Sequence, residues 1–99
     1  MNITAEEAKH IMDTEEGYII LDVRTQEEYD QGHIPGAILI PNTAIEAKAA
    51  DVLTDKNQLI LVYCRSGRRS KIAAEALVEL GYTNIKEFGG SIDWPYEVE

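Results

Sequence analysis

The sequence predicts an α/β fold with a mainly parallel sheet that is covered by helices on both faces. Short apolar runs alternate with segments of helical periodicity along all 99 residues. The apolar runs are almost continuous, as they are in parallel strands buried on both faces. Parallel neighbours need a crossover connection, which a helix usually supplies. Because the length suits a single compact unit and no linker interrupts it, we expect one domain over residues 1–99.

Three Thr-x-x-Glu sequences mark the starts of the first three predicted helices. In such a capping box the threonine side chain accepts a bond from the third helical amide, and the glutamate bonds back to the cap amide. The boxes begin at Thr4, Thr25 and Thr43. They predict a helix over residues 5–13, a short helix that ends at Gly32, and a helix that buries Ile45, Ala49, Val52 and Leu53.

Four apolar runs are typical of strands, because they are short and bounded by turn residues. They cover residues 18–23, 37–40, 59–63 and 84–88. The third run is the most apolar, so we expect it at the centre of the sheet. The helix that follows it ends at Gly81 and has an apolar face made of Ile72, Ala73, Ala76, Leu77 and Leu80.

The charge balance excludes some partners. Eighteen acids and nine bases give a net charge of −9, which repels nucleic acids and anionic membrane surfaces at long range. No apolar run approaches the roughly 20 residues of a membrane-spanning helix. The N-terminus lacks the pattern of a secretory signal, so a cytoplasmic location is expected. Residues 56–74 nevertheless hold five bases and no acid, so this segment carries +5 and the remainder −14.

The only cysteine, Cys64, directly follows the predicted central strand. A single cysteine cannot form an internal disulfide, and its spacing from His10 and His33 matches no zinc site. We therefore expect neither a bound metal nor a structural disulfide. Ligands of open parallel sheets bind beyond the carboxyl ends of the strands, which is where Cys64 is placed.

The loop after this strand has the composition of an anion-binding site. It runs Cys64-Arg65-Ser66-Gly67-Arg68-Arg69-Ser70, and a helix begins near Arg68 or Ser70. Gly67 permits an unusual backbone turn that points amide groups inward above the helix N-terminus. Amides, the helix dipole and the three arginines all favour a thiolate. Such settings lower a cysteine pKa from about 8.5 to roughly 3.5–7.5, which predicts a nucleophile at neutral pH.

The chain contains four short motifs, and the third of them includes this loop. They are Leu21-Asp22-Val23-Arg24 with Glu28-Tyr29, then Gly32-His33-Ile34-Pro35-Gly36-Ala37, then Val62-Tyr63 with the loop itself, and finally Gly89-Gly90 with Trp94. In this order and spacing they resemble the signatures of the rhodanese family of sulfurtransferases, over nearly the whole chain. The resemblance implies a rhodanese-like three-layer sandwich with a five-stranded, mainly parallel sheet. It also implies the free-standing, single-domain type.

The resemblance further implies a reaction and a set of site residues. Cys64 is the expected nucleophile, and it would carry sulfur as a persulfide without a metal or an organic cofactor. Substrate binding is expected from Arg65, Ser66, Gly67, Arg68, Arg69 and Ser70. The donor would be a small anion such as thiosulfate, or a persulfide. The acceptor would be a thiol of a small molecule or a protein, or cyanide in an assay. A monomer is favoured.

Two other functions are compatible with parts of this pattern. Cysteine-dependent phosphatases and arsenate reductases use a similar loop, but the phosphatase loop follows Cys-x5-Arg, and position 70 here is serine. The arginine at position 69 gives Cys-x4-Arg, whose smaller ring of amides suits a sulfur atom better than a phosphate. A non-catalytic, rhodanese-like interaction module is the remaining alternative. The usual sign of such a module is loss of the cysteine, which is present here.

The other polar and aromatic residues near these motifs are expected to be structural. Asp22 and Arg24 would form an ion pair or a brace for the loop. His33 would pack or form hydrogen bonds, and His10 would face solvent. Phe88 would belong to the core, whereas the sequence leaves open whether Trp94 is core or a wall of the site.

Overall fold

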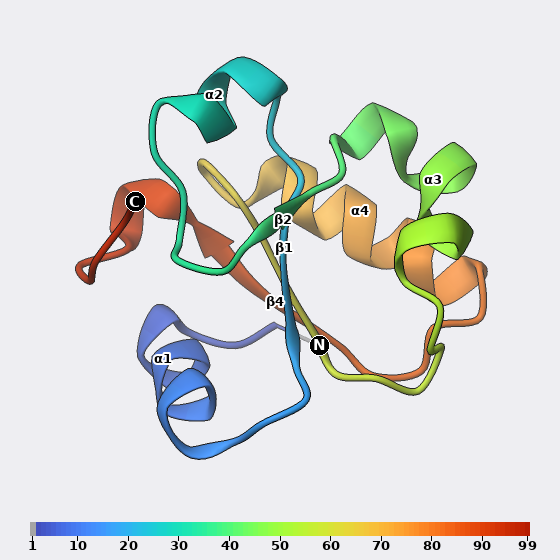
Figure 1. Ribbon diagram of the computed structural model, residues 1–99, viewed down its shortest axis with the longest axis horizontal. Helices are drawn as coiled ribbons and strands as arrows, with labels where there is room; N and C mark the ends of the chain where they lie inside the picture. Colours follow the sequence, from blue (N-terminus) through green and yellow to red (C-terminus); the bar gives the residue numbers. More distant parts are fainter. Residues whose placement is uncertain (1) are drawn as a thin grey trace.

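The computed structural model describes residues 2–99, and its centre is a four-stranded parallel sheet (Figure 1). The elements are α1 (Ala5–Thr14), β1 (Ile19–Asp22), α2 (Gln26–Asp30), β2 (Ile38–Leu39), the 3-10 turn η1 (Asn42–Ala44), α3 (Ile45–Val52), β3 (Ile60–Cys64), α4 (Arg68–Glu79), β4 (Ile85–Gly90) and the 3-10 turn η2 (Ser91–Asp93). The strands lie in the order β2-β1-β3-β4. The α/β class and the parallel sheet are therefore confirmed.

The central position predicted for the third strand is confirmed, and the fifth strand is not found. All five residues of β3 are buried, and β3 pairs with both β1 and β4. Within residues 2–99, four strands form the sheet. Beside β4, Asn2 forms an isolated parallel bridge to Glu87, and the Ile3 amide donates to the Glu87 carbonyl at 2.8 Å. The chain covers this edge with a segment too short to count as a strand.

Helices cover both faces of the sheet, as predicted. Figure 1 shows α1 on one face, α3 and α4 on the other, and α2 above the carboxyl end of the strands. Successive strand residues point to opposite faces, so β3 supplies both cores. Val62 packs with Leu77 of α4, whereas Leu61 and Tyr63 pack in the cluster that contains Ala8 of α1.

Two of the three predicted capping boxes are present. Thr4 and Thr25 each accept a bond from the third helical amide, and the glutamate of each box bonds back. The third box is wrong, because Thr43 lies inside η1 and α3 begins only at Ile45 without a side-chain cap. The amide of Ala44 donates to the Pro41 carbonyl at 2.8 Å, and this bond closes a 3-10 turn where the box was expected.

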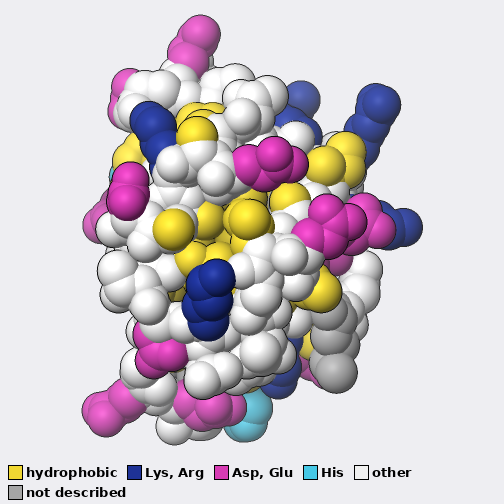
Figure 2. All heavy atoms as spheres, turned by 90° about the vertical axis from the view of Figure 1, so that its right-hand side faces the viewer, with side chains coloured by type: hydrophobic (Ala, Val, Ile, Leu, Met, Phe, Trp, Pro, Cys, Tyr) yellow, Lys and Arg dark blue, Asp and Glu magenta, His cyan; other side chains and the backbone are white. Residues whose placement is uncertain are grey.

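The apolar faces of α3 and α4 are narrower than predicted. Val52 and Ile72 were expected in the core, but they are 46% and 49% exposed. On α4 the buried positions are Ser70, Ala73 and Leu77, three and four residues apart, and Ile72 lies outside this stripe. Figure 2 views the molecule from the side of α3 and α4, and it shows apolar side chains at this surface among charged ones. None of the helices in the described part of the chain is long and apolar enough to cross a membrane.

Candidate active site

Cys64 lies at the carboxyl end of the central strand, where the next residues form a sharp loop. It is the last residue of β3, and its side chain is buried. Gly67 has a φ of +98°, in the left-handed region that glycine adopts readily, and α4 begins at the next residue. This turn lets the Gly67 amide donate to the Cys64 sulfur at 3.0 Å. The predicted amide nest at a helix N-terminus is therefore present around the sulfur.

Two opposing effects act on the ionisation of Cys64. Burial raises the pKa of the thiol, because it disfavours the charged form. The Ser70 hydroxyl and the amides of Ser70, Gly67 and Ser66 act in the other direction, because they can donate hydrogen bonds to a thiolate. The net result is a Cys64 pKa below the usual value for cysteine. A lowered pKa increases the fraction of thiolate near neutral pH, which is the reactive form.

Ser70 connects the sulfur to a buried acid on the neighbouring strand. The Cys64 thiol lies 3.6 Å from Ser70 Oγ. The Ser70 hydroxyl lies 2.7 Å from Oε1 of Glu87, a residue of β4 that is 5% exposed. The same Oε1 accepts a bond from the Gly89 amide at 3.1 Å. Three elements, β3, α4 and β4, therefore meet directly behind the sulfur.

The loop packs with its backbone directly against the end of β4. Cys64 pairs with Gly90 across an irregularity in the β3–β4 ladder, at which Gly89 has a φ of +84°. A Cβ atom placed on Gly90 would lie 1.8 Å from the Arg65 carbonyl oxygen. Since such a contact is impossible, residue 90 must be glycine for the loop to hold this position.

The three loop arginines have different surroundings. Arg69 forms two hydrogen bonds with the Glu28 carboxylate, at 2.6 and 3.0 Å. This bond with Glu28 lowers the pKa of that carboxyl to about 2. Arg65 and Arg68 are exposed, as is Ser66, and neither arginine forms an ion pair with an acid of residues 2–99. Arg65 lines a polar groove at the mouth of the loop together with Arg24, Glu28, Gln31, Gly32 and Ser91.

Behind the loop, the ion pair expected between Asp22 and Arg24 is confirmed. The Arg24 guanidinium donates to Asp22 Oδ2 at 2.6 Å and to the Gly32 carbonyl at 2.7 Å. The Tyr63 hydroxyl also donates to Asp22 Oδ2, at 2.7 Å. Burial raises the pKa of Tyr63, so this hydroxyl stays protonated. The network ties β1 to β3 immediately before Cys64, and it acts as a brace.

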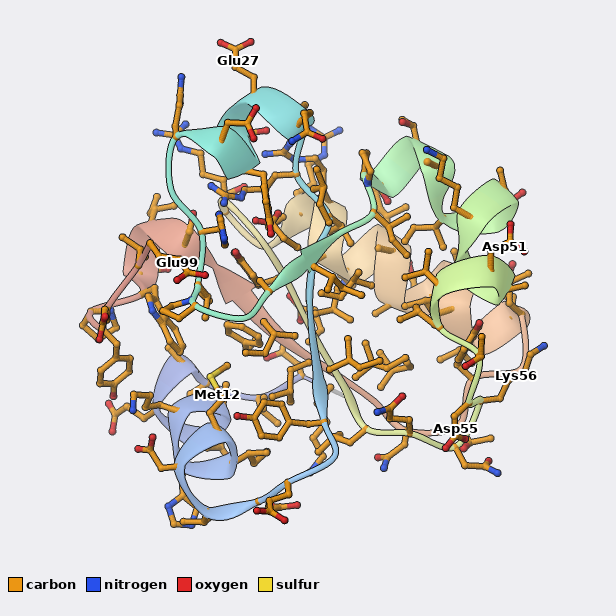
Figure 3. All side chains as sticks on the ribbon, in the orientation of Figure 1. Met12, Glu27, Asp51, Asp55, Lys56 and Glu99 are labelled. Carbon is orange, nitrogen blue, oxygen red and sulfur yellow. The ribbon has the colours of Figure 1, made fainter. Side chains whose placement is uncertain are left out.

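The remaining sequence expectations near the site also concern structure. His33 stacks on Tyr29, with ring centroids 3.7 Å apart, and its backbone exchanges hydrogen bonds of 2.9 and 2.8 Å with Glu99. Figure 3 shows Glu99 beside the loop that follows α2. Phe88 and Trp94 pack in one core cluster, which decides the open question about Trp94, and His10 is exposed. Within residues 2–99, no three His, Cys, Asp or Glu side chains form a group that could hold a metal ion.

Two side chains near the sulfur were missed by the sequence reasoning. Glu28 was assigned only a capping role, yet it also binds Arg69, which lies 41 positions later in the chain. Glu87 was placed in a strand without any role. One available signal was that Glu87 is the only acid of its strand and lies two positions after Ile85, on the strand face that the fold buries.

Fold and site together define a parallel α/β protein with an ionisable cysteine at a helix N-terminus. The sequence profile of the Rhodanese-like domain matches residues 4–94. The chain belongs to the Rhodanese-like domain family, as its motifs indicated. Relatives of this chain are named as sulfurtransferases.

Similarity to known proteins extends over most of the chain. It is 44% identical over 73 residues to the thiosulfate sulfurtransferase PspE of Escherichia coli, covering 74% of this chain and 70% of that protein. It is 38% identical over 98 residues to the putative sulfur carrier protein YrkF of Bacillus subtilis, covering 98% of this chain and 52% of YrkF. The chain thus spans only about half the length of the second relative.

Solved structures share the fold. A rhodanese with anions from E. coli has a TM-score of 0.77 at 39% identity, covering 83% of this chain and 96% of that one. A rhodanese-like domain protein from Staphylococcus aureus has a TM-score of 0.84 at 33% identity, covering 99% and 95%. The rhodanese-like domain of the Alr3790 protein from Anabaena sp. has a TM-score of 0.91 at 28% identity, covering 99% and 77%.

Proposed function

We propose that this protein is a sulfurtransferase in which Cys64 accepts a sulfur atom from an anionic donor and passes it to a thiol. The observation that carries the proposal is the position of the Cys64 sulfur, 3.0 Å from the Gly67 amide at the N-terminus of α4. Such a setting stabilises negative charge on the sulfur and on atoms bonded to it. The sulfurtransferase relatives support the same chemistry.

The first half-reaction loads the cysteine. The Cys64 thiolate attacks the outer sulfur of thiosulfate, a new S–S bond forms, and the S–S bond of thiosulfate breaks. Sulfite leaves with the electron pair of that bond, and Cys64 becomes a persulfide. Because the thiol has a lowered pKa, the step needs no separate general base. The loop amides would hold the terminal persulfide sulfur as an anion.

The second half-reaction regenerates the cysteine. An acceptor thiolate attacks the terminal sulfur of the persulfide, and the Cys64 sulfur leaves as a thiolate. The product is a persulfide of the acceptor, or thiocyanate when cyanide replaces the thiol in an assay. Two half-reactions through a covalent enzyme predict ping-pong kinetics.

The positive charges at the mouth of the loop would attract an anionic donor. Arg65 is exposed at the groove and Arg68 lies nearby on the first turn of α4. Arg69 is partly neutralised by Glu28, so we assign it a smaller share of the attraction than Arg65. Thiosulfate use should therefore weaken as salt is added, because exposed charges are screened.

Intact mass measurement tests this proposal directly. Incubation with thiosulfate should add the mass of one sulfur atom to the protein, and a thiol should remove it. The variant Cys64→Ser should not gain the mass, should retain a native circular dichroism spectrum, and should lose transfer from thiosulfate to cyanide. The variant Val78→Ser is the matched control, because it places a serine at an exposed position near the end of α4, outside the loop.

Other outcomes of this measurement would support the alternative functions. A wild-type protein that never gains sulfur would favour an interaction module. Cys64-dependent hydrolysis of an aryl phosphate, without sulfur loading, would favour a phosphatase. Undiminished sulfur transfer by Cys64→Ser would overturn the mechanism.

A further inference from the structure

A buried acid lies behind the Cys64 loop, and the proposed sulfur transfer assigns it no task. Glu87 is 5% exposed, and its Oε1 accepts bonds from the Ser70 hydroxyl at 2.7 Å and from the Gly89 amide at 3.1 Å. This oxygen also lies 3.8 Å from the position that a Cβ on Gly67 would occupy. A carboxylate is costly to bury unless it has partners. Its location beneath the loop therefore calls for a functional explanation.

The Ser70 hydroxyl cannot donate a hydrogen bond to all of its neighbours at once. Its hydroxyl oxygen lies 3.0 Å from the Gly67 carbonyl, 3.3 Å from the Gly89 carbonyl, 2.7 Å from the Glu87 carboxylate and 3.6 Å from the Cys64 sulfur. A hydroxyl has a single hydrogen to donate. The carboxylate is both the nearest acceptor and a charged one, so it takes this hydrogen in the resting protein. The Cys64 thiol then donates to the Ser70 oxygen.

Ionisation of Cys64 must reverse this arrangement. A thiolate has no hydrogen to give, and it accepts one from Ser70 instead. The thiolate then competes with the Glu87 carboxylate for the single hydrogen of the Ser70 hydroxyl. If Glu87 stays ionised, two negative charges share one hydroxyl hydrogen, and ionisation of the sulfur is opposed.

We propose that Glu87 is a positioning residue that acts through Ser70: it competes with the Cys64 thiolate for the Ser70 hydrogen and so opposes ionisation of the sulfur. Its relevance to sulfur transfer rests on the proposed function, whereas its effect on the thiol does not. Glu87 therefore counteracts part of the stabilisation that the loop amides give to the thiolate, and Ser70 is the connection between the two acids.

Other charged groups face this pair from the surrounding elements. Glu87 lines a surface groove with Asn2, Lys71, Ala74 and Glu75. Lys71 and Glu75 belong to α4 and carry opposite charges. On the side of the sulfur, Arg69 interacts electrostatically with Cys64, and the Arg69 guanidinium is also bound by Glu28. Arg65 lies at the mouth of the loop. None of these groups contacts Ser70 Oγ, so the direct competition is between Glu87 and Cys64.

The test is the pH dependence of alkylation of Cys64 by iodoacetamide, which reacts with the thiolate. In Glu87→Gln the side chain is nearly isosteric and neutral, and its amide can donate to Ser70, which frees the Ser70 hydrogen for the sulfur. We expect the midpoint of the alkylation profile to fall by about one pH unit, the size expected for a hydrogen bond to a charged group. An unchanged or raised midpoint would overturn the proposal.

Two further variants separate a coupling through Ser70 from other effects. In a Ser70→Ala background, Glu87→Gln should shift the midpoint by less than half as much, because the connecting hydroxyl is gone. An equal shift in both backgrounds would mean that charge acts directly through space, and it would reject the role of Ser70. Glu75→Gln removes an exposed acid at the same groove and should leave the midpoint unchanged.

A measurement on the wild-type protein guards against a variant that does not fold. The carboxyl carbon of Glu87, followed by NMR, should show an inflection at the pH midpoint of Cys64 and lose it after alkylation of the sulfur. An identical titration before and after alkylation would overturn the coupling. Neither assay involves sulfur transfer. A protein that shows the coupling and never loads sulfur would disprove the proposed function alone.

Discussion

Two arginine–carboxylate pairs lie near the Cys64 loop, and they differ mainly in their access to water. Asp22 and Arg24 approach to 2.6 Å with side chains 0% and 7% exposed. Glu28 and Arg69 also approach to 2.6 Å, but their side chains are 25% and 33% exposed. Both pairs make more than one hydrogen bond. The same chemistry is thus present in two environments.

The difference in burial gives the two pairs different roles. Removing one partner of a buried pair leaves an uncompensated charge away from water, which is strongly destabilising. A pair near the surface is screened, so its loss affects stability little. The first pair therefore braces the end of the sheet. Substitutions in the second pair can therefore alter the charge at the mouth of the loop with little loss of stability.

The largest expected effect comes from breaking the buried pair. Asp22→Ala leaves Arg24 without its carboxylate and the Tyr63 hydroxyl without its acceptor. We expect the free energy of unfolding to fall by about 3–5 kcal/mol, measured by urea denaturation. Glu28→Gln should cost less than about 1 kcal/mol in the same assay. Similar losses of stability for the two variants would contradict the assignment of the Asp22–Arg24 pair as the brace.

A smaller effect is expected on donor binding when either partner of the Glu28–Arg69 pair is replaced. Glu28→Gln leaves Arg69 with an uncompensated positive charge, which should lower KM for thiosulfate. Arg69→Gln leaves Glu28 negative, which should raise it. A change of about 1 kcal/mol, or roughly fivefold, is expected for each. An uncharged donor such as a dialkyl trisulfide should show neither change. Shifts in the same direction for both variants would refute a charge effect.

The smallest expected effect is the acid dependence of the Glu28–Arg69 pair. The bond to Arg69 lowers the pKa of Glu28 from 4.5 to about 2 in the folded protein. Its contribution to stability is therefore complete above the unfolded value of 4.5 and is lost as the pH falls towards about 2. The stability difference between wild type and Glu28→Gln should be constant near neutral pH and close in this acidic window. Urea titrations at several pH values measure it, and a difference that persists at the acid end would contradict the pairing.

The parts of the site that are encoded by neighbouring residues could be predicted from the sequence. The position of Cys64 at the end of the central strand follows from strand hydrophobicity, and the turn at Gly67 follows from local composition. Both are encoded within a few neighbouring residues. The Asp22–Arg24 pair is also local, since its members are two positions apart.

The missed contacts depend on tertiary packing. Glu28 meets Arg69 across 41 positions, and Glu87 meets Ser70 across 17. Both acids had simpler interpretations, a helix cap and a strand residue. The third capping box is absent because Thr43 lies inside a 3-10 turn, and the preceding residue, Asn42, donates to the Val23 carbonyl after β1. Ile72 was wrongly placed in the core because the periodicity identifies an apolar helix but not the width of its buried stripe.

The contact between Gly90 and the Arg65 carbonyl has a consequence for how new specificities could arise. Backbone packs on backbone there, so this contact does not depend on the side chains at the exposed positions of the loop. The side chains at positions 65, 66 and 68 point to solvent and are free of that constraint. A selection experiment could therefore randomise these three positions while keeping Gly67 and Gly90. The fold separates the part that holds a reactive atom from the part that chooses what reaches it, and only the second part needs to change for a different donor.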